Sequence, residues 1–418
     1  MDQILFADLF KSQQKHYLIQ TMFSWVLAAL VGVISGVVTG LIPGLHPNTV
    51  IFTSLPAYLG TEIQRMVYIS YVTGLSVSHT FHDFLPAIFI SAPEAESALS
   101  VVASPELVEK GKGLEAFYST VRGGLNSVLA VGILILPMVF FLKPVYSFIS
   151  GFMEYILAFF LFYILLSSDD FFVSLVVAIF SGSLGLIAFN TPVNQQFVLI
   201  PVFSGLFAVP GVYSILNQDF EVPEQHQLGE SVFSLSRHGF VGSVSGLLAG
   251  TVPGIGAAVS TSFVSPIMDE SKKGFLSAMG GINTSDIFFS LISLAVIDKA
   301  RSGASVAIQA IGTSSSSSVF YLLLLAFLVA PLAAYLSVRV SKMYVDLIEG
   351  SSIEYIAYPV LVLIPLICFL LTGWRGMLVL GAASSVGFVA QRTDSRKACM
   401  SVLIIPTLIS FSGITIFI

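Results

Sequence analysis

The sequence predicts an all-α, polytopic membrane protein with about 12 transmembrane segments. Of its 418 residues, 55% are hydrophobic and 10% are charged, and the mean hydropathy is +0.91. Soluble domains carry about 25% charged residues. Apolar runs long enough to cross a bilayer, about 20 residues each, recur along the whole chain. A Gly- and Pro-rich stretch occurs twice, at 32–56 and at 242–266, which indicates two repeats.

The repeated stretch has the pattern of a broken helix. In each copy three glycines recur every four residues, which places them on one helical face where another helix can approach closely. They are Gly32, Gly36 and Gly40 in the first copy and Gly242, Gly246 and Gly250 in the second. A Pro-Gly pair then interrupts the helix, at Pro43-Gly44 and at Pro253-Gly254.

A short apolar segment follows each interruption, over 47–60 and 254–268. The first would be about 20 Å long as a helix, whereas the hydrocarbon core of a bilayer is about 30 Å thick. Each segment is therefore either a re-entrant half-helix or a short crossing buried in protein.

The other elements of the first half (residues 1–217) follow from its apolar runs and its charges. A helix over 22–42 precedes the first Pro-Gly pair. A loop is predicted over 92–118, which holds five glutamates and two lysines. The remaining segments are predicted at 66–91, 120–141, 144–166, 171–189 and 196–217.

An acidic connector, 218–236, divides the halves, and the second half (residues 237–418) repeats the plan. A helix from about 238 reaches Pro253-Gly254. The later spans are predicted at 277–297, 319–341, 353–372, 374–391 and 398–417.

The basic residues predict how the two repeats are oriented. Cytoplasmic loops of membrane proteins are enriched in Lys and Arg, so we assign the basic positions to the cytoplasmic side and the connector to the outside. These positions are Lys11, Lys15, Arg65, Lys143, Arg339, Lys342, Arg392, Arg396 and Lys397. The first repeat then enters from inside and the second from outside, which makes the repeats inverted, as in many secondary transporters.

The helix breaks predict an anion site. A helix that starts within the membrane presents unpaired N–H groups and the positive end of its dipole, and both favour anions. Two such ends that face each other would form a pocket for a small carboxylate. Its candidate residues are Pro43, Gly44, His46, Asn48, Thr49, Pro253, Gly254, Gly256, Ser260 and Thr261.

Polar clusters at matching places in the two halves are candidates for ion coupling. Ionisable residues within membrane segments are costly and mark functional sites. In the first half, Asp83 can bind a cation or a proton, and either histidine can titrate near neutral pH; in the second half, side-chain oxygens suit Na⁺. The candidates are His79, His82, Asp83, Asn283, Thr284 and Asp286. A helix end near water, with these groups capping it, is the alternative interpretation.

Two other functions fit the same features. Helix N-termini would also hold the phosphate of a lipid, which makes a lipid transporter or flippase an alternative. A membrane enzyme or metal-binding protein built on His46, His79, His82 and Asp83 is another. Neither a nucleophile-base pair nor a GxxxxGK motif for ATP is evident, so we expect no enzyme and no resident cofactor or metal. With 18 basic and 24 acidic residues, nothing predicts a nucleic-acid partner.

Several motifs resemble one transporter family. GLIPGLHPNT at 40–49 and GTVPGIGAA at 250–258 are similar to the paired Pro-Gly motifs of the TctA-type large membrane subunit of tripartite tricarboxylate transporters. SAPEAESALS at 91–100 and EKGKGLEAF at 109–117 resemble a loop of that family. The chain looks like a member of its short, archaeal-like branch.

The resemblance implies carboxylate uptake driven by an ion gradient, with an extracytoplasmic solute-binding protein and a small membrane subunit as partners. By motif, Pro43, Gly44, Asn48, Pro253, Gly254 and Gly256 would frame the site. We therefore expect a multi-pass secondary transporter of the cell membrane that moves a small organic anion with Na⁺ or H⁺.

Overall fold

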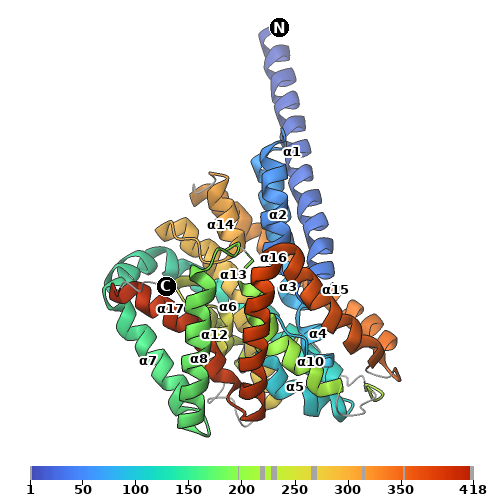
Figure 1. Cartoon of the computed structure of the whole chain (residues 1–418). Helices are drawn as coiled ribbons and strands as arrows, with labels where there is room; N and C mark the ends of the chain where they lie inside the picture. Colours follow the sequence, from blue (N-terminus) through green and yellow to red (C-terminus); the bar gives the residue numbers. More distant parts are fainter. Residues whose placement is uncertain are drawn as a thin grey trace.

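The computed structural model describes residues 2–195, 197–216, 222–226, 233–264, 271–312, 316–351 and 354–414. Within these ranges the side chains of residues 2–21, 264, 316, 317 and 356 are not described. The described chain consists of helices joined by turns and short loops (Figure 1), which confirms the all-α class.

The first half contains ten α-helices and two short segments of other helical type in its described part. They are α1 (Asp2–Leu41), α2 (Pro47–Leu59), α3 (Arg65–His82), α4 (Phe84–Phe89), α5 (Ser100–Glu109), α6 (Gly113–Ile149), η1 (Ser150–Phe152), α7 (Met153–Leu166), α8 (Phe171–Asn190), α9 (Leu199–Phe203), η2 (Ser204–Ala208) and α10 (Val209–Leu216).

The second half continues with α11 (Arg237–Thr251), α12 (Ala257–Val264), α13 (Lys272–Ile297), α14 (Gly303–Ala310), α15 (Ser316–Ile348), α16 (Glu354–Arg392), η4 (Arg396–Met400) and α17 (Ser401–Ser412). Helix α16 has a kink at Gly373, whose φ of 66° and ψ of −165° suit only glycine. The kink falls between the spans predicted at 353–372 and 374–391.

Seven helical stretches in the described part of the chain are long and apolar enough to cross a membrane. Their outward-facing side chains include Phe148, Phe172 and Leu370, which are 73%, 77% and 71% exposed; large exposed apolar surface of this kind is typical of proteins that contact lipid or a partner. Two of the seven stretches, Gly113–Leu166 and Ala357–Arg392, each contain two predicted spans. The total of about 12 crossings stays a prediction.

Helices α1 and α3 pack side by side and run parallel. A Cβ atom added to Gly36 would lie 2.5 Å from the Leu75 carbonyl oxygen, and one added to Gly40 would lie 2.5 Å from Cβ of His82. The contacts advance together along both helices, so the chain direction is the same. Helix α2 must therefore return toward the end from which α1 came, and Figure 1 shows it beside α1.

Helices α11 and α13 repeat this arrangement. A Cβ atom on Gly242 would meet the carbonyl oxygen of Ala278, and one on Gly250 would lie 2.5 Å from Cβ of Phe289. This pair is also parallel. The predicted role of the glycines spaced every four residues, close helix approach, is confirmed in both copies.

Both Pro-Gly pairs form tight turns. Gly44 and Gly254 have φ values of +84° and +78°, and the amide of Leu45 donates to the Ile42 carbonyl over 3.1 Å. Proline followed by glycine with positive φ is the pattern of a type II turn. The predicted helix breaks therefore exist, and α2 and α12 start just after them. The part of the predicted segment 254–268 beyond residue 264 lies outside the described residues.

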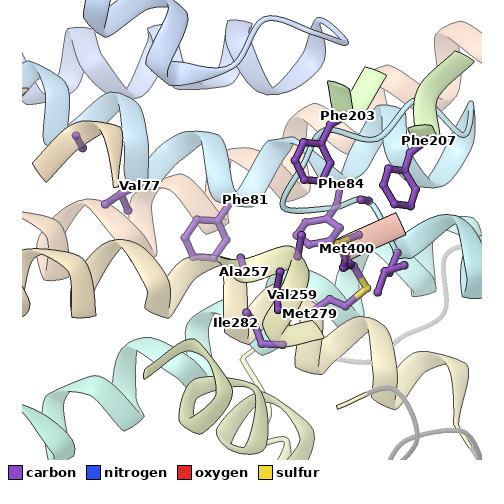
Figure 2. Packing of buried hydrophobic residues seen from close by; sticks show 14 of the residues in the cluster. Val77, Phe81, Phe84, Phe203, Phe207, Ala257, Val259, Met279, Ile282 and Met400 are labelled. Atoms are coloured by element: carbon purple, nitrogen blue, oxygen red, sulfur yellow. The ribbon is translucent and has the colours of Figure 1, made fainter. Parts of the chain in front are cut away.

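The core contains buried residues from both halves of the chain. Figure 2 shows Phe81, Phe84, Phe203 and Phe207 gathered with smaller residues of the second half, among them Ala257, Val259 and Ile282. Close packing of this kind holds two helix starts in fixed positions.

The two ends of the molecule carry different segments. The His226 amide donates to the carbonyl of Gly111, just before α6, and the amide of Gly350, just after α15, donates to the Val222 carbonyl. At the opposite end of the molecule, near the C-terminal end of α6, Arg301 donates to the Tyr146 hydroxyl. The described part of the connector therefore lies at the end where α6 begins and α15 finishes.

Some sequence predictions were wrong. The basic positions do not share one side. Lys143 lies near the C-terminal end of α6, whereas Arg339 and Lys342 lie near the C-terminal end of α15, which is the end of the molecule where α6 begins. These residues lie within helices rather than in loops, so the rule for loops does not apply to them. The first span, predicted at 22–42, matches the apolar stretch Met22–Leu41, although the helix that contains it begins at Asp2. The break predicted after 141 falls instead at 150–152.

The predicted loop 92–118 is also wrong. It contains α5 and the start of α6, and its residues Glu94, Ser97 and Glu115 are buried. Five of its seven charged side chains, Glu94, Glu96, Glu106, Lys110 and Glu115, form ion pairs, which a count of charges along the sequence does not reveal. The two-half division at the connector remains a prediction.

Candidate functional site

A cavity of about 180 Å³ lies where the starts of α2 and α12 meet. His46, Pro47 and Asn48 line it from the first helix break, and Gly256, Ala257 and Ala258 line it from the second. The predicted meeting of the two breaks therefore occurs.

The start of α2 is fixed by its own residues. Pro47 occupies the first helical position, and His46 is the N-cap, whose Nδ1 accepts a hydrogen bond from the Asn48 amide over 3.1 Å. The Asn48 side chain contacts Gly303 at the start of α14. The first turn of α2 thus faces both the cavity and a third helix start.

Arg301 supplies a positive charge at the cavity. It lines the cavity beside Ser302 and Gly303, and its Nη2 donates to the Tyr146 hydroxyl over 2.7 Å. The buried Nε has no hydrogen-bond partner. Ser302 and Ser305 form a capping box that holds the start of α14, so the guanidinium is carried by an ordered turn.

Two glutamates reach the site from the segment that precedes α5. The Glu96 carboxylate lies 3.2 Å from His46 Nε2, and the Glu94 carboxylate lies 3.3 Å from His79 Nε2. One ligand atom from each of His46, His79 and Glu94 lies within 4.8 Å of the others. Together with Asp83 and Asp286, the region holds four carboxyl groups near one guanidinium.

Asp83 joins the two halves. It is 1% exposed, and its Oδ2 accepts a hydrogen bond from Asn283 Nδ2 over 2.9 Å. One turn away, the hydroxyls of Thr80 and Thr284 lie 3.3 Å apart. The predicted polar clusters of the two halves are therefore in direct contact, across α3 and α13.

The remaining predicted site residues divide into two groups. Thr49, Gly44 and His46 line a smaller adjoining cavity, and Asn283 and Asp286 line the main one. Pro43, Pro253, Ser260 and Thr261 do not line either of these cavities. Thr261 donates to the Ala257 carbonyl within its own helix, and Gly254 packs against Thr407.

The predicted alternative set of His46, His79, His82 and Asp83 does not form one cluster. His82 is buried, and its Nδ1 lies 2.7 Å from the Ser78 carbonyl of its own helix, while Asp83 is bonded to Asn283. Only His46 and His79 come together, with ring centres 5.4 Å apart.

The sequence analysis gave no role at the site to Glu94, Glu96 or Arg301. The two glutamates lie in SAPEAESALS, a run of mostly small and apolar residues. Such neighbours are the sequence feature that could have predicted the burial of these glutamates. Arg301 had no comparable signal, because a basic residue just after a helix is common.

Comparison with known proteins decides the family. Residues 26–402 match the family model described as the tripartite tricarboxylate transporter TctA family. The chain belongs to this TctA family. It is therefore a transporter and not an enzyme, and the resemblance drawn from the paired Pro-Gly motifs is confirmed.

A relative from Methanocaldococcus jannaschii, described as an uncharacterized protein, is 27% identical to this TctA chain. The match covers 92% of this chain and 98% of the relative. No solved structure matches the chain.

Proposed function

We propose that this TctA chain is the large subunit of a secondary transporter of the cell membrane, which moves a small organic anion bearing carboxylate groups together with Na⁺ or H⁺. One observation carries the proposal: two helix starts, one from each half, open into one cavity beside Arg301. The N–H groups of both helix starts and the dipoles behind them favour a negative charge at that place.

Arg301 is suited to hold a carboxylate. A guanidinium presents its donors in a planar fork that matches the two oxygens of a carboxylate. One nitrogen is already bonded to Tyr146, which fixes the fork, and Nε is left without a partner. The Asn48 side chain lies at the same edge of the cavity and can add a hydrogen bond.

The arrangement of the two units supports alternating access. The first unit, α1 to α3, starts at one end of the molecule, and the second, α11 to α13, starts at the opposite end. We infer an inverted repeat, in which each re-entrant helix reaches the substrate from its own side. Rocking of one repeat against the other would then expose the same cavity to either side in turn.

Asp83, Asn283, Thr80 and Thr284 form the proposed coupling site. Their oxygens suit Na⁺, and the Asp83 carboxyl can instead take a proton. Because the group bridges α3 and α13, an ion bound there would alter the contact between the repeats. His79, His82 and Asp286 remain candidates for the same role.

The TctA family supplies the large subunit of a tripartite system that works with a binding protein and a small membrane subunit. We propose that this chain has both kinds of partner, with the binding protein outside the cell membrane.

The test is uptake of labelled di- and tricarboxylates into proteoliposomes, with and without a Na⁺ or pH gradient. We expect Arg301→Gln and Asn48→Ala to reduce uptake at least about tenfold, because a lost hydrogen bond to a charged group is worth about 1.5–3 kcal/mol. Arg375→Gln is the matched control, because Arg375 bonds the Pro192 carbonyl on the surface and should transport normally.

Melting temperatures of the same variants, measured in detergent with each carboxylate, report binding separately from transport. Stabilisation by a carboxylate in wild type that is lost in Arg301→Gln would support the site. Stabilisation by phospholipid and by no carboxylate would refute the carboxylate assignment and favour the lipid alternative.

A further inference from the structure

His46, His79, Glu94 and Glu96 form a compact group of ligating side chains at the cavity edge. They come from three separate places: the break before α2, the last turn of α3 and the segment before α5. His79 and Glu94 are 3% and 8% exposed. Tertiary packing therefore brings two imidazoles and two carboxylates together in a site that is buried at His79 and Glu94 and partly exposed at His46 and Glu96, whose side chains are 22% and 27% exposed.

Several of the atoms that face one another in this group lack hydrogen bonds. His79 Nε2, one Glu94 oxygen and one Glu96 oxygen are buried and make no hydrogen bond; their contacts are the ion pairs His79–Glu94 and His46–Glu96. An unsatisfied buried polar atom is costly, and more so if it is charged. Three of them directed into one small space indicate that a further group normally lies between them.

The spacing of these atoms fits a metal ion. In a tetrahedral zinc site with ligand distances of about 2.0–2.1 Å, neighbouring ligand atoms lie about 3.3–3.4 Å apart. His46 Nε2 lies 3.2 Å from Glu96 and His79 Nε2 lies 3.3 Å from Glu94, and one ligand atom from each of His46, His79 and Glu94 lies within 4.8 Å of the other two. Two imidazole nitrogens and two carboxylate oxygens are a donor set for zinc and similar divalent transition metals.

We propose that His46, His79 and Glu94 bind a divalent transition-metal ion, with Zn²⁺ as its best match, and that Glu96, which lies 3.2 Å from His46 Nε2, is the carboxylate available for the fourth position. The contacts of His79 support this assignment. Its other ring nitrogen, Nδ1, lies 3.0 Å from the Thr39 hydroxyl, and ligating histidines usually carry such a second hydrogen bond.

Metal binding would change the start of α2. In the structure Nδ1 of His46 accepts the Asn48 amide proton, so the proton of a neutral ring sits on Nε2. A metal on Nε2 moves that proton to Nδ1, and Nδ1 can no longer accept. The Asn48 amide is then released toward the cavity, where it can bind an anion.

The charges at the cavity also favour binding of the metal together with the anion. Glu96 and Asp286 line the main cavity together with Arg301, and Glu94 lines the smaller cavity beside it. A polyanion would be repelled there unless a cation joined it, and a divalent ion supplies that charge. The metal site itself does not depend on the proposed carboxylate transport, because it rests on the four side chains alone.

The test is calorimetric titration of the purified, untagged, full-length chain with Zn²⁺, in detergent and excess Na⁺ and without carboxylate. We expect one ion per chain. His79→Gln and Glu94→Gln should each weaken binding at least about tenfold, which is the scale seen when even an outer partner of a metal ligand is removed. Co²⁺ in place of Zn²⁺ should give the visible absorption of a tetrahedral site.

His46→Asn is the most informative variant, because asparagine keeps the N-cap of α2 and removes the imidazole. It should fold, as size-exclusion chromatography will show, and bind the metal weakly. His238→Gln and Glu109→Gln, outside the group, are the controls and should bind as wild type does. Absence of Zn²⁺ binding in wild type, or equal binding in all folded variants, would overturn the proposal. Carboxylate transport without metal binding would leave the proposed function intact.

Discussion

At the residue scale, the central feature is a buried hydrogen bond between a carboxyl group and an amide side chain, which no local pattern specifies. Asp83 and Asn283 are 200 residues apart in the sequence and share a hydrogen bond of 2.9 Å. The other oxygen of Asp83 is buried without a hydrogen-bond partner. A carboxyl group left in this state is poised to take a cation or a proton.

Asp83→Asn is therefore expected to uncouple transport. Asparagine keeps the volume and polarity of the side chain but cannot bind a proton and carries no charge for Na⁺. Uptake into proteoliposomes should lose its dependence on the Na⁺ or pH gradient, while the melting temperature changes little.

Asp170→Asn provides the matched control. Asp170 caps α8 by accepting from the Val173 amide over 3.0 Å, and asparagine caps helices equally well. Should Asp83→Asn retain full gradient dependence, Asp83 would not be the coupling residue.

At the element scale, the molecule depends on helices that approach at glycines. On α6, a Cβ atom added to Gly123 would overlap the carbonyl oxygen of Ser277 on α13, and one added to Gly280 would overlap the carbonyl oxygen of Thr120. Backbone atoms cannot move aside as a flexible side chain can. Since α13 carries Asn283 and Asp286, this packing also positions the site.

Gly123→Ala is expected to destabilise the protein by at least about 1–3 kcal/mol, the usual cost of overpacking a core. Gly132→Ala on the same helix is the control, because Gly132 is exposed and the nearest atom to its added Cβ is 3.8 Å away, on Phe327. Alanine stabilises a helix relative to glycine by about 1 kcal/mol. The melting temperature should fall for the first variant and stay or rise for the second; equal values would contradict the close approach.

A second contact between elements is electrostatic and exposed. Glu106 on α5 accepts from Lys110 over 2.5 Å and from Lys272 at the start of α13. The hydrogen bond from Lys110, followed by that from Lys272, lowers the pKa of Glu106 from 4.5 to about 2. A carboxyl with a lowered pKa contributes stability above its ordinary pKa and loses it as the pH falls toward the folded value.

The difference in melting temperature between wild type and Glu106→Gln should thus be largest above pH 4.5 and disappear toward pH 2. It should be small and should shrink in high salt, because exposed ion pairs are weak and screened. Glu109→Gln on the same helix should show no such pH dependence. A difference that grew as the pH fell would contradict this pairing.

At the scale of the whole molecule, the two parallel helix pairs start at opposite ends. The turn between α2 and α3 lies at the end where α1 starts, and the residues before α11 lie at the other end. If the protein spans the membrane as proposed, these two places face opposite sides. That topology follows from the return of α2 toward the end where α1 starts.

Single cysteines test this topology. Glu62→Cys and Leu235→Cys are at exposed positions, and the natural Cys368 and Cys399 are buried, so background labelling should be low. In intact cells a membrane-impermeant maleimide should label one variant only, and lysis should expose the other. Labelling of both variants in intact cells would rule out the inverted arrangement.

The sequence by itself determined the membrane class, the helix breaks and the family. Apolar length, the rigid φ of proline and the positive φ open to glycine are local properties, so they can be recognised at Pro43-Gly44 and Pro253-Gly254 without knowing the fold. The glycines spaced every four residues predicted close helix approach for the same reason.

The tertiary structure decided which charges meet. Glu94 and Glu96 were assigned to a loop, yet packing places them against His79 and His46, and it brings Arg301 to the start of α2. Contacts such as that of His46 with Glu96, or of Arg301 with the start of α2, join residues far apart in the sequence and depend on which helices run parallel and which return, as α2 does. That arrangement is set by the burial of the whole chain, and no short stretch of sequence carries it.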